Sequence, residues 1–180
     1  MELELISEFQ INGDTSEKIN HLLKKCFPYI AYNGRDYFKQ LPHSRILAWE
    51  NSTLIGQVGI DFRVMNLNNT AVSVFGVVDL CVDPEFQGQG IGNALMVEFE
   101  RIATSNSDKI DFMFLVTNAP SFYEKLGFSV IDITTSWLKI HNHKNNGIGN
   151  ERIKDAFFLI KSVSSKKWND GMLDLLGYMY

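Results

Sequence analysis

A glycine-rich segment, FQGQGIGNALM at residues 86–96, has the clearest chemical potential in this sequence. Three glycines, Gly88, Gly90 and Gly92, alternate with other residues just before an apolar pattern of helical spacing. Glycine loses more backbone freedom on folding than any other residue, so their clustering indicates a need for bare backbone. A loop before a helix presents free N–H groups at the positive end of the helix dipole, which favours an anion. The segment therefore predicts a site for a phosphate or pyrophosphate group.

Three alternative interpretations of this segment are a Walker A loop, a Rossmann dinucleotide-binding loop and a turn that binds no ligand. A Walker A loop, GxxxxGK[ST], requires a lysine that this segment lacks. A Rossmann fingerprint reads GxGxxG inside a βαβ unit, whereas this segment reads GxGxG after strands that favour a meander. A glycine-rich turn that binds nothing is the third alternative. The residues on either side of the loop help to separate these alternatives.

The wider segment VVDLCVDPEFQGQGIGNALMVEFE, residues 77–100, resembles the cofactor-binding motif of the GNAT family of acyl-CoA-dependent N-acetyltransferases. In that family a strand and an Asp-Pro-type turn precede [RQ]-x-x-G-x-[GA], which opens a helix; residues 87–92 match it with glutamine first. Further along, TNAPSFYEKLGF at 117–128 resembles the second family motif, an asparagine ending a strand and a short helix carrying F-Y-x-x-x-G-F. The resemblance covers residues 44–130, with both motifs in the family's order.

This resemblance implies how acetyl-CoA would bind. The pyrophosphate would lie on the loop amides, and the pantetheine arm would run beside the preceding strand like an additional strand. That strand, at 71–82, and the one at 109–117 would have to splay apart into a V-shaped cleft. Asn118 would face the arm, and its alternative role is an N-cap for the next helix. The implied cofactor-binding residues are Leu80, Cys81, Val82, Gln87, Gly88, Gln89, Gly90, Ile91, Gly92, Asn93 and Asn118.

Acetyl transfer to an amine needs a neutral amine, a stabilised oxyanion and a proton for the leaving thiolate. The resemblance assigns the proton to Tyr123, since the family's tyrosine commonly serves as general acid to the CoA sulfur; packing against the cofactor is its alternative role. Asp79 is a candidate base because partial burial would raise the pKa of its carboxyl, and a surface or hydrogen-bonded aspartate is the alternative. The family often has a glutamate nearby on this strand, and none is present, so water could serve instead. A backbone N–H near Leu80 or Cys81 would polarise the thioester carbonyl.

The sequence gives weaker indications of where the amine acceptor would bind. Aromatic residues at 29–43 suggest a covered acceptor site, with core packing as the alternative, and His43 is a candidate for its lining. A diffuse similarity to aminoglycoside 2'-N-acetyltransferases and nodulation-type N-acyltransferases adds Asp174 and the carboxylate of Tyr180 as candidate amine ligands. We therefore expect an N-acetyltransferase acting on a small-molecule amine such as an amino sugar. A transferase of longer acyl chains, a protein acetyltransferase and a non-catalytic acyl-CoA sensor are the alternatives.

Apolar periodicity predicts the elements that would position these residues. The predicted fold class is α/β (α+β): a mixed, mostly antiparallel central sheet flanked by helices, formed by residues 1–180 as one domain. We expect a short helix or lid at 29–43, a flexible loop at 141–150 and a tail after the last strand. The remaining expected elements are strands near 3–9, at 44–50, 53–67, 71–82, 109–117, 137–140 and 155–163, and helices at 14–27, 91–105 and 119–128.

Bulk composition argues against several classes of protein. The chain is 45% hydrophobic and 21% charged over 180 residues, which is typical of a globular protein with a substantial core. A net charge of −4 argues against a nucleic-acid binder. Cys26 and Cys81 lack the spacing of a metal site or a disulfide framework, so we expect neither, and no metal. Without a basic leader or a long apolar run we expect no membrane span, and a cytoplasmic protein compatible with a homodimer.

Overall fold

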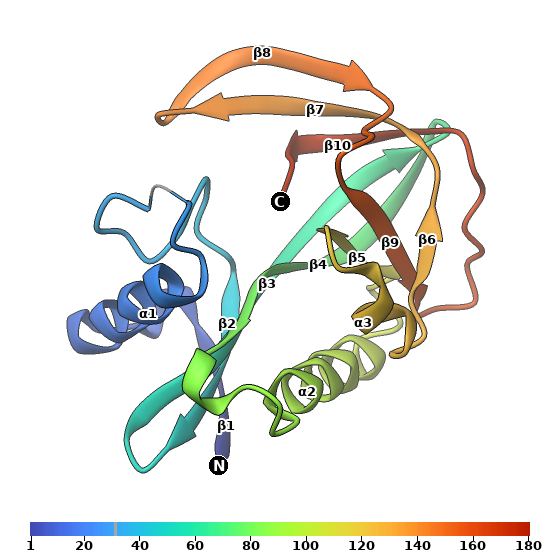
Figure 1. Ribbon diagram of the computed structural model, residues 1–180. Helices are drawn as coiled ribbons and strands as arrows, with labels where there is room; N and C mark the ends of the chain where they lie inside the picture. Colours follow the sequence, from blue (N-terminus) through green and yellow to red (C-terminus); the bar gives the residue numbers. More distant parts are fainter. Residues whose placement is uncertain (31) are drawn as a thin grey trace. The chain divides into compact units, whose positions relative to one another are not determined.

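The computed structural model describes residues 1–30 and 32–180. These residues form two compact units, Met1–Asp61 with Val77–Arg101 and Phe62–Gly76 with Ile102–Tyr180. Two long strands, β3 (Thr53–Leu67) and β4 (Thr70–Val82), and helix α2 (Ile91–Ser105) contribute residues to both units (Figure 1). The prediction of a single acyltransferase domain over 1–180 stays a prediction.

The first unit packs one amphipathic helix against an antiparallel array of strands. Strand β1 pairs with β2, and β2 pairs with the first half of β3. The α1 residues Ile19, Leu22 and Leu23 recur at helical spacing and are buried against Leu47 and Leu54 of the strands. The elements confined to this unit are β1 (Glu2–Ser7), the 3-10 helix η1 (Glu8–Gln10), α1 (Gly13–Cys26), β2 (Ser44–Glu50) and the 3-10 helix η2 (Pro84–Phe86).

The second unit is built on a mixed sheet. From the end of the β3–β4 hairpin the sheet continues through β5, β9 and β6 on one side and through β10, β7 and β8 on the other. Only the β4–β5 and β10–β7 pairs are parallel among the pairs described, so the predicted mostly antiparallel sheet is confirmed. Its elements are β5 (Phe112–Thr117), α3 (Pro120–Glu124), β6 (Ser129–Ile131), β7 (Thr134–His141), β8 (Lys144–Glu151), β9 (Phe157–Ser162) and β10 (Met172–Tyr178).

The parallel register of β4 and β5 joins Val74 to Phe112 and Gly76 to Phe114 within the second unit. The V-shaped opening predicted further along these strands involves residues of both units and stays a prediction. Within the described residues, no helix has the length and apolarity needed to cross a bilayer.

Two predictions of local structure are wrong, and a third is wrong in one of its two alternatives. The predicted flexible loop at 141–150 is mostly strand β8, because Asn142 and His143 adopt positive φ of 47° and 57° and turn the chain into a hairpin (orange in Figure 1). The predicted tail forms β10, which pairs with both β3 and β7. Over the described residues of 29–43 the chain forms turns and bends, so the predicted short helix is wrong, whereas a lid stays a prediction; residue 31 lies outside the described residues.

Gly56 of β3 lets the start of α2 approach the sheet closely. A Cβ at this position would lie 3.2 Å from the Ile91 Cγ2, 3.2 Å from the Leu95 Cδ1 and 3.2 Å from the carbonyl oxygen of Cys81. One of these neighbours is backbone and the other two belong to buried side chains, so the space cannot open without a shift of α2 or β4.

We expect Gly56→Ala to lower the free energy of unfolding by about 1–3 kcal/mol, the usual cost of overpacking a core. The measurement is equilibrium urea unfolding. Gly13→Ala is the matched control: it adds the same methyl at the first residue of α1, where a Cβ meets nothing within 4 Å, and should be neutral or stabilising. Equal stability of Gly56→Ala and the parent chain would contradict the close packing described here.

Candidate functional site

The glycine loop lies exposed between η2 and α2. Gly88 and Gly90 have φ of 77° and 81°, in the left-handed region that favours glycine. A Cβ at either position would meet no atom within 4 Å, so backbone conformation, and not crowding, calls for glycine. Ile91, by contrast, is buried and anchors the first turn of α2. The loop is therefore a fixed backbone shape with open space beside it.

The backbone N–H groups at the start of α2 lack acceptors among the described residues. The first N–H of this segment to donate is that of Ala94, to the Gly90 carbonyl at 2.9 Å. The amides of residues 88–93 are thus available at the positive end of a 15-residue helix. An array of this kind can bind a phosphate or pyrophosphate group. Of the predicted set, Gln87, Gly88, Gln89, Gly90, Ile91, Gly92 and Asn93 lie in this segment.

Contacts to the end of β4 hold the start of the loop. The Gln87 Nε2 donates to the Val82 carbonyl at 3.1 Å, and the Cys26 Sγ donates to the same oxygen at 3.3 Å. The Asp83 N–H donates to the Ile55 carbonyl at 2.8 Å. Because the Val82 carbonyl already accepts two hydrogen bonds, a pantetheine arm pairing with residues 80–82 would have to use other backbone groups.

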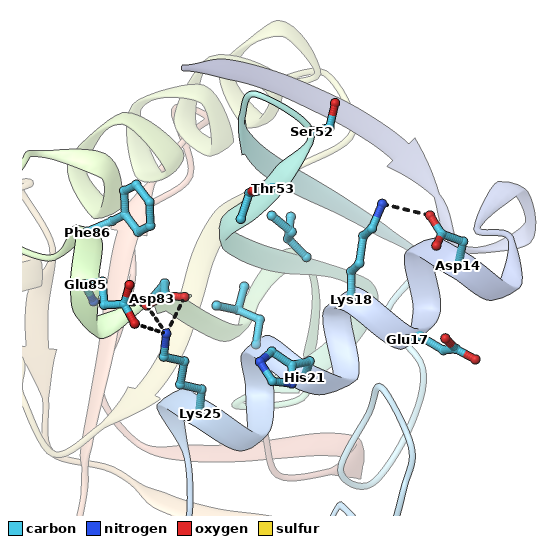
Figure 2. A pocket seen from close by; sticks show the side chains of 12 residues that line it. Asp14, Glu17, Lys18, His21, Lys25, Ser52, Thr53, Asp83, Glu85 and Phe86 are labelled. Atoms are coloured by element: carbon cyan, nitrogen blue, oxygen red, sulfur yellow. Dashed lines mark hydrogen bonds and ion pairs between the residues drawn. The ribbon is translucent and has the colours of Figure 1, made fainter.

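Lys25 ties the C-terminal end of α1 to the turn before the loop. Its ammonium lies 2.8 Å from the Asp83 Oδ1 and 2.9 Å from the Glu85 Oε1 (Figure 2). Asp83 is only 8% exposed and also accepts from the Glu85 N–H at 3.0 Å. Burial works against its ionisation, but the Lys25 and Glu85 hydrogen bonds outweigh burial and lower the pKa of Asp83. The turn is therefore fixed by an ionised carboxylate.

A hollow of about 720 Å³ lies beside this turn in the first unit (Figure 2). Four carboxylates line it against two lysines, so its charge is poorly suited to a pyrophosphate, and the loop amides fit an anion better. Its lining residues are Asp14, Glu17, Lys18, His21, Leu22, Lys25, Ser52, Thr53, Leu54, Asp83, Glu85 and Phe86.

Asp79 interrupts the extended backbone of β4. Its φ is 49°, a conformation that aspartate tolerates better than most residues. The Tyr32 hydroxyl donates a weak hydrogen bond to its Oδ1 at 3.4 Å, and the Gln57 Nε2 donates to its carbonyl oxygen at 2.7 Å. Burial raises the pKa of Asp79, and Arg45, the Tyr32 hydroxyl and Lys39 only partly offset that effect. The result is a carboxylate with enhanced basicity on the strand that leads into the loop.

A series of buried hydrogen bonds runs from Arg45 through Gln57 to the Asp79 carbonyl. Arg45 is 1% exposed; its Nη1 donates to the Gln57 Oε1 at 3.0 Å, and its Nε and Nη2 donate to the Glu8 carboxylate at 2.9 and 3.1 Å. Its Nη2 also donates to the Asp36 carbonyl at 2.8 Å. Sequence reasoning missed this chain, although a lone arginine within the apolar strand SRILAWE was an available signal.

Tyr123 and Asn118 belong to the second unit. The Tyr123 ring on α3 packs edge-on against Phe122 and Phe128, at centroid distances of 4.9 and 5.9 Å. Its hydroxyl makes no hydrogen bond to any residue that the structure describes, and burial raises the pKa of Tyr123 to about 12. Asn118 is exposed, and the residue at the N-cap position of α3 is Ala119, so the capping role weighed for Asn118 is wrong.

The candidate acceptor residues have structural partners of their own. The His43 Nδ1 lies 3.1 Å from the Asp61 Oδ1. The Asp174 Oδ1 accepts from the Leu176 N–H at 2.9 Å. The Tyr180 ring lies against the Arg63 guanidinium, 4.5 Å from its centroid, within the second unit. Roles for His43, Asp174 and Tyr180 in binding an amine stay predictions.

Comparisons with known proteins agree on one family. A family model described as an acetyltransferase (GNAT) domain matches residues 10–131. The curated "Uncharacterized N-acetyltransferase MJ1207" of Methanocaldococcus jannaschii is 27% identical over 157 residues, 76% of this chain and 67% of its own. The GNAT family N-acetyltransferase YhbS of Escherichia coli, solved with CoA, superposes with a TM-score of 0.64 at 15% identity, covering 96% of this chain and 88% of that chain. An aminoglycoside 6'-N-acetyltransferase complexed with coenzyme A gives 0.62 at 13% identity, covering 93% and 100%.

The raised pKa of Asp79 predicts a pH-dependent gain in stability for Asp79→Asn. Because the folded state holds the Asp79 proton more tightly than the unfolded state, its contribution to stability is present at acidic pH and is lost as pH rises through the raised pKa. Asparagine keeps the shape, tolerates positive φ and cannot ionise. We expect the variant to gain stability relative to the parent chain as pH rises to neutrality, measured by urea unfolding at several pH values. A difference that shifts the other way with pH would contradict burial as the dominant influence on Asp79.

Proposed function

Because the chain belongs to the GNAT family of acetyltransferases, we propose that it transfers the acetyl group of acetyl-CoA directly to a primary amine of a small molecule. The observation that carries the proposal is the exposed array of backbone amides at residues 88–93, ahead of α2. Its positive electrostatic character and left-handed glycines suit the pyrophosphate of acetyl-CoA. Acetyl transfer and the use of CoA are properties of the family, whereas the acceptor class and the residue roles are our proposal.

The cofactor would be held mainly by main-chain groups. We assign the pyrophosphate to the amides of residues 88–93 and the pantetheine arm to the backbone of Leu80 and Cys81. The Val82 carbonyl contributes indirectly, since it holds the Gln87 side chain at 3.1 Å. We assign Asn118 to the pantetheine arm because it occupies the asparagine position of the second family motif and its side chain is exposed.

Asp79 is assigned as the base that prepares the acceptor. A small amine is an ammonium ion at neutral pH, and a carboxylate attracts it and can take its proton, directly or through a water. The raised pKa of Asp79 makes its carboxylate a better base, and the Tyr32 and Gln57 contacts fix its position. The net charge of −4 agrees with a cationic acceptor.

The transfer then proceeds through one tetrahedral intermediate. The neutral amine attacks the thioester carbonyl, the C–N bond forms, and a backbone N–H near Leu80 or Cys81 stabilises the oxyanion. The C–S bond breaks as the intermediate collapses, and the Tyr123 hydroxyl gives its proton to the leaving thiolate. The attacking nitrogen, cationic after the C–N bond forms, loses one proton, which passes through water to restore the Tyr123 hydroxyl. A pKa of about 12 keeps this phenol protonated at neutral pH but makes it a weak acid. Its contribution to the rate should therefore lie near the lower end of the general-acid range.

Gly90→Asp tests the loop assignment. A carboxylate at this position would repel the pyrophosphate, and we expect the affinity for acetyl-CoA to fall at least about a hundredfold, or ~2.7 kcal/mol, by calorimetric titration. Gly147→Asp in β8 is the matched control, because Gly147 has a φ of 89° and open space around its Cβ position. It carries the same backbone strain and should leave the affinity unchanged. Unchanged affinity in Gly90→Asp would refute the loop as the pyrophosphate site.

Tyr123→Phe separates the general acid from a binding residue. We expect kcat to fall about a hundredfold while the Kd of acetyl-CoA changes less than about twofold, because phenylalanine keeps the ring contacts with Phe122 and Phe128. Steady-state thiol release and calorimetry measure the two quantities. Equal losses in both would show that Tyr123 only binds the cofactor.

The pH profile of kcat/KM tests Asp79. Activity should rise with pH as the Asp79 carboxyl ionises, since only the carboxylate accepts a proton. Tyr32→Phe removes the hydrogen bond that favours the ionised form, so the acid limb of the profile should move to higher pH. Asp79→Asn should remove the limb and most of the activity. An unchanged limb in both variants would assign the proton to water.

The function as a whole is tested by thiol release from acetyl-CoA against a panel of amino sugars, polyamines and amino acids. Release with one class of amine supports the proposal and identifies the acceptor. Binding of acetyl-CoA without release on any panel member would favour a longer acyl donor, a protein acceptor or a non-catalytic sensor over the reaction proposed here.

A further inference from the structure

Two thiols that are distant in the sequence meet in the first unit. Cys26 is the last residue of α1, and Cys81 lies near the end of β4. Each thiol is the leading influence on the pKa of the other, so the two side chains lie close together. Both belong to the apolar cluster beneath α1, where Cys81 is 7% exposed and Cys26 remains partly accessible. Spacing along the chain predicted no such pair.

The thiol pair shares an acceptor with the glycine loop. The Cys26 S–H donates to the carbonyl of Val82, the residue after Cys81, at 3.3 Å. The same carbonyl accepts from the Nε2 of Gln87, the first residue of the loop, at 3.1 Å. Lys25, the neighbour of Cys26, binds Asp83 and Glu85 in the following turn. A change at Cys26 therefore acts on the backbone that presents the loop amides.

The two thiols differ in reactivity. The nearby Cys81 thiol lowers the pKa of Cys26, with help from the Lys25 ammonium and against burial and Asp83. The Cys26 thiol, together with burial, raises the pKa of Cys81. The thiolate is the attacking form in thiol–disulfide exchange, so the accessible Cys26 is suited to attack and the buried Cys81 to resolve.

We propose that Cys26 and Cys81 are a redox modification site, which a low-molecular-weight disulfide oxidises to an intramolecular disulfide, and that this bond weakens acyl-CoA binding at the glycine loop. The second half rests on the proposed function. The first half rests on the place of both thiols in the cluster beneath α1 and on the contact of Cys26 with the residue after Cys81.

The oxidation is a balanced two-step exchange. The Cys26 thiolate attacks one sulfur of the disulfide RSSR, forms a mixed disulfide and expels RS⁻, which takes up the proton that Cys26 released. Cys81 then loses its proton and attacks the Cys26 Sγ, and the second RS⁻ leaves with that proton as RSH. One RSSR is reduced to two RSH while the two cysteines lose two electrons and two protons.

The bond changes the end of β4 in two ways. Cys26 no longer carries a proton, so the Val82 carbonyl loses one of its two donors. The sulfurs must also approach to about 2.05 Å, which draws the end of α1 and β4 together beside the Lys25–Asp83 ion pair. Both effects displace the backbone just before Gln87.

The test uses the full chain with oxidised glutathione as the probe. Alkylation of the remaining thiols and peptide mass spectrometry should show Cys26 joined to Cys81. Calorimetry should show acetyl-CoA binding about threefold to tenfold weaker in the oxidised than in the reduced chain, which corresponds to the loss of about one hydrogen bond. Glutathione retained on Cys26 without a cross-link would overturn the pair. A complete cross-link with unchanged affinity would overturn its coupling to the loop.

Two variants keep the test independent of the proposed function. Cys26→Ser retains a hydroxyl donor for the Val82 carbonyl and cannot be oxidised, so oxidised glutathione should leave its acetyl-CoA affinity unchanged; an equal loss in this variant would place the effect elsewhere. Cys81→Ser should trap glutathione on Cys26, and failure to do so would contradict the attacking role. If the reduced parent chain does not bind acetyl-CoA, the proposed function and the coupling fall together, while the cross-link still decides the pair.

Discussion

The candidate site depends on backbone N–H groups at the start of α2 that have no acceptor within the described chain. The amides of residues 88–93 are exposed to solvent or a ligand, and two left-handed glycines set the shape of the backbone that carries them. In the free protein, water can accept hydrogen bonds from these amides, so leaving them without a protein acceptor costs little stability. An anion can then replace that water. The sequence around the loop can then vary in side chains, because the main chain provides the binding groups.

Contacts from α1 fix the segment that delivers these amides. Lys25 binds the turn through Asp83, and Cys26 reaches the Val82 carbonyl that also holds Gln87. A few residues earlier on β4, the buried chain from Arg45 through Gln57 holds the Asp79 backbone in its unusual conformation. The same short stretch of β4 thus carries both the candidate base and the anchor of the anion loop.

The loop and its helix could be predicted from sequence because both signals are local. Glycines and a helical apolar pattern placed α2 at Ile91–Ser105, and the strands at 44–50 and 53–67 were predicted at their observed bounds. The arginine within SRILAWE signalled a buried cation, but its partners and the Cys26–Cys81 pair could not be predicted, since they arise where distant segments meet. The hairpin at Asn142–His143 was missed because this turn uses positive φ without a glycine.

The central claim, that main-chain amides of the glycine loop bind the pyrophosphate, is tested most directly by nitrogen-15 NMR. Backbone amide shifts would be followed while acetyl-CoA is titrated into the labelled chain. We expect the largest downfield proton shifts at the amides of residues 88–93, because new hydrogen bonds to phosphate oxygens form there. Saturable binding with those amides unmoved, and with the largest changes in another part of the chain, would contradict it.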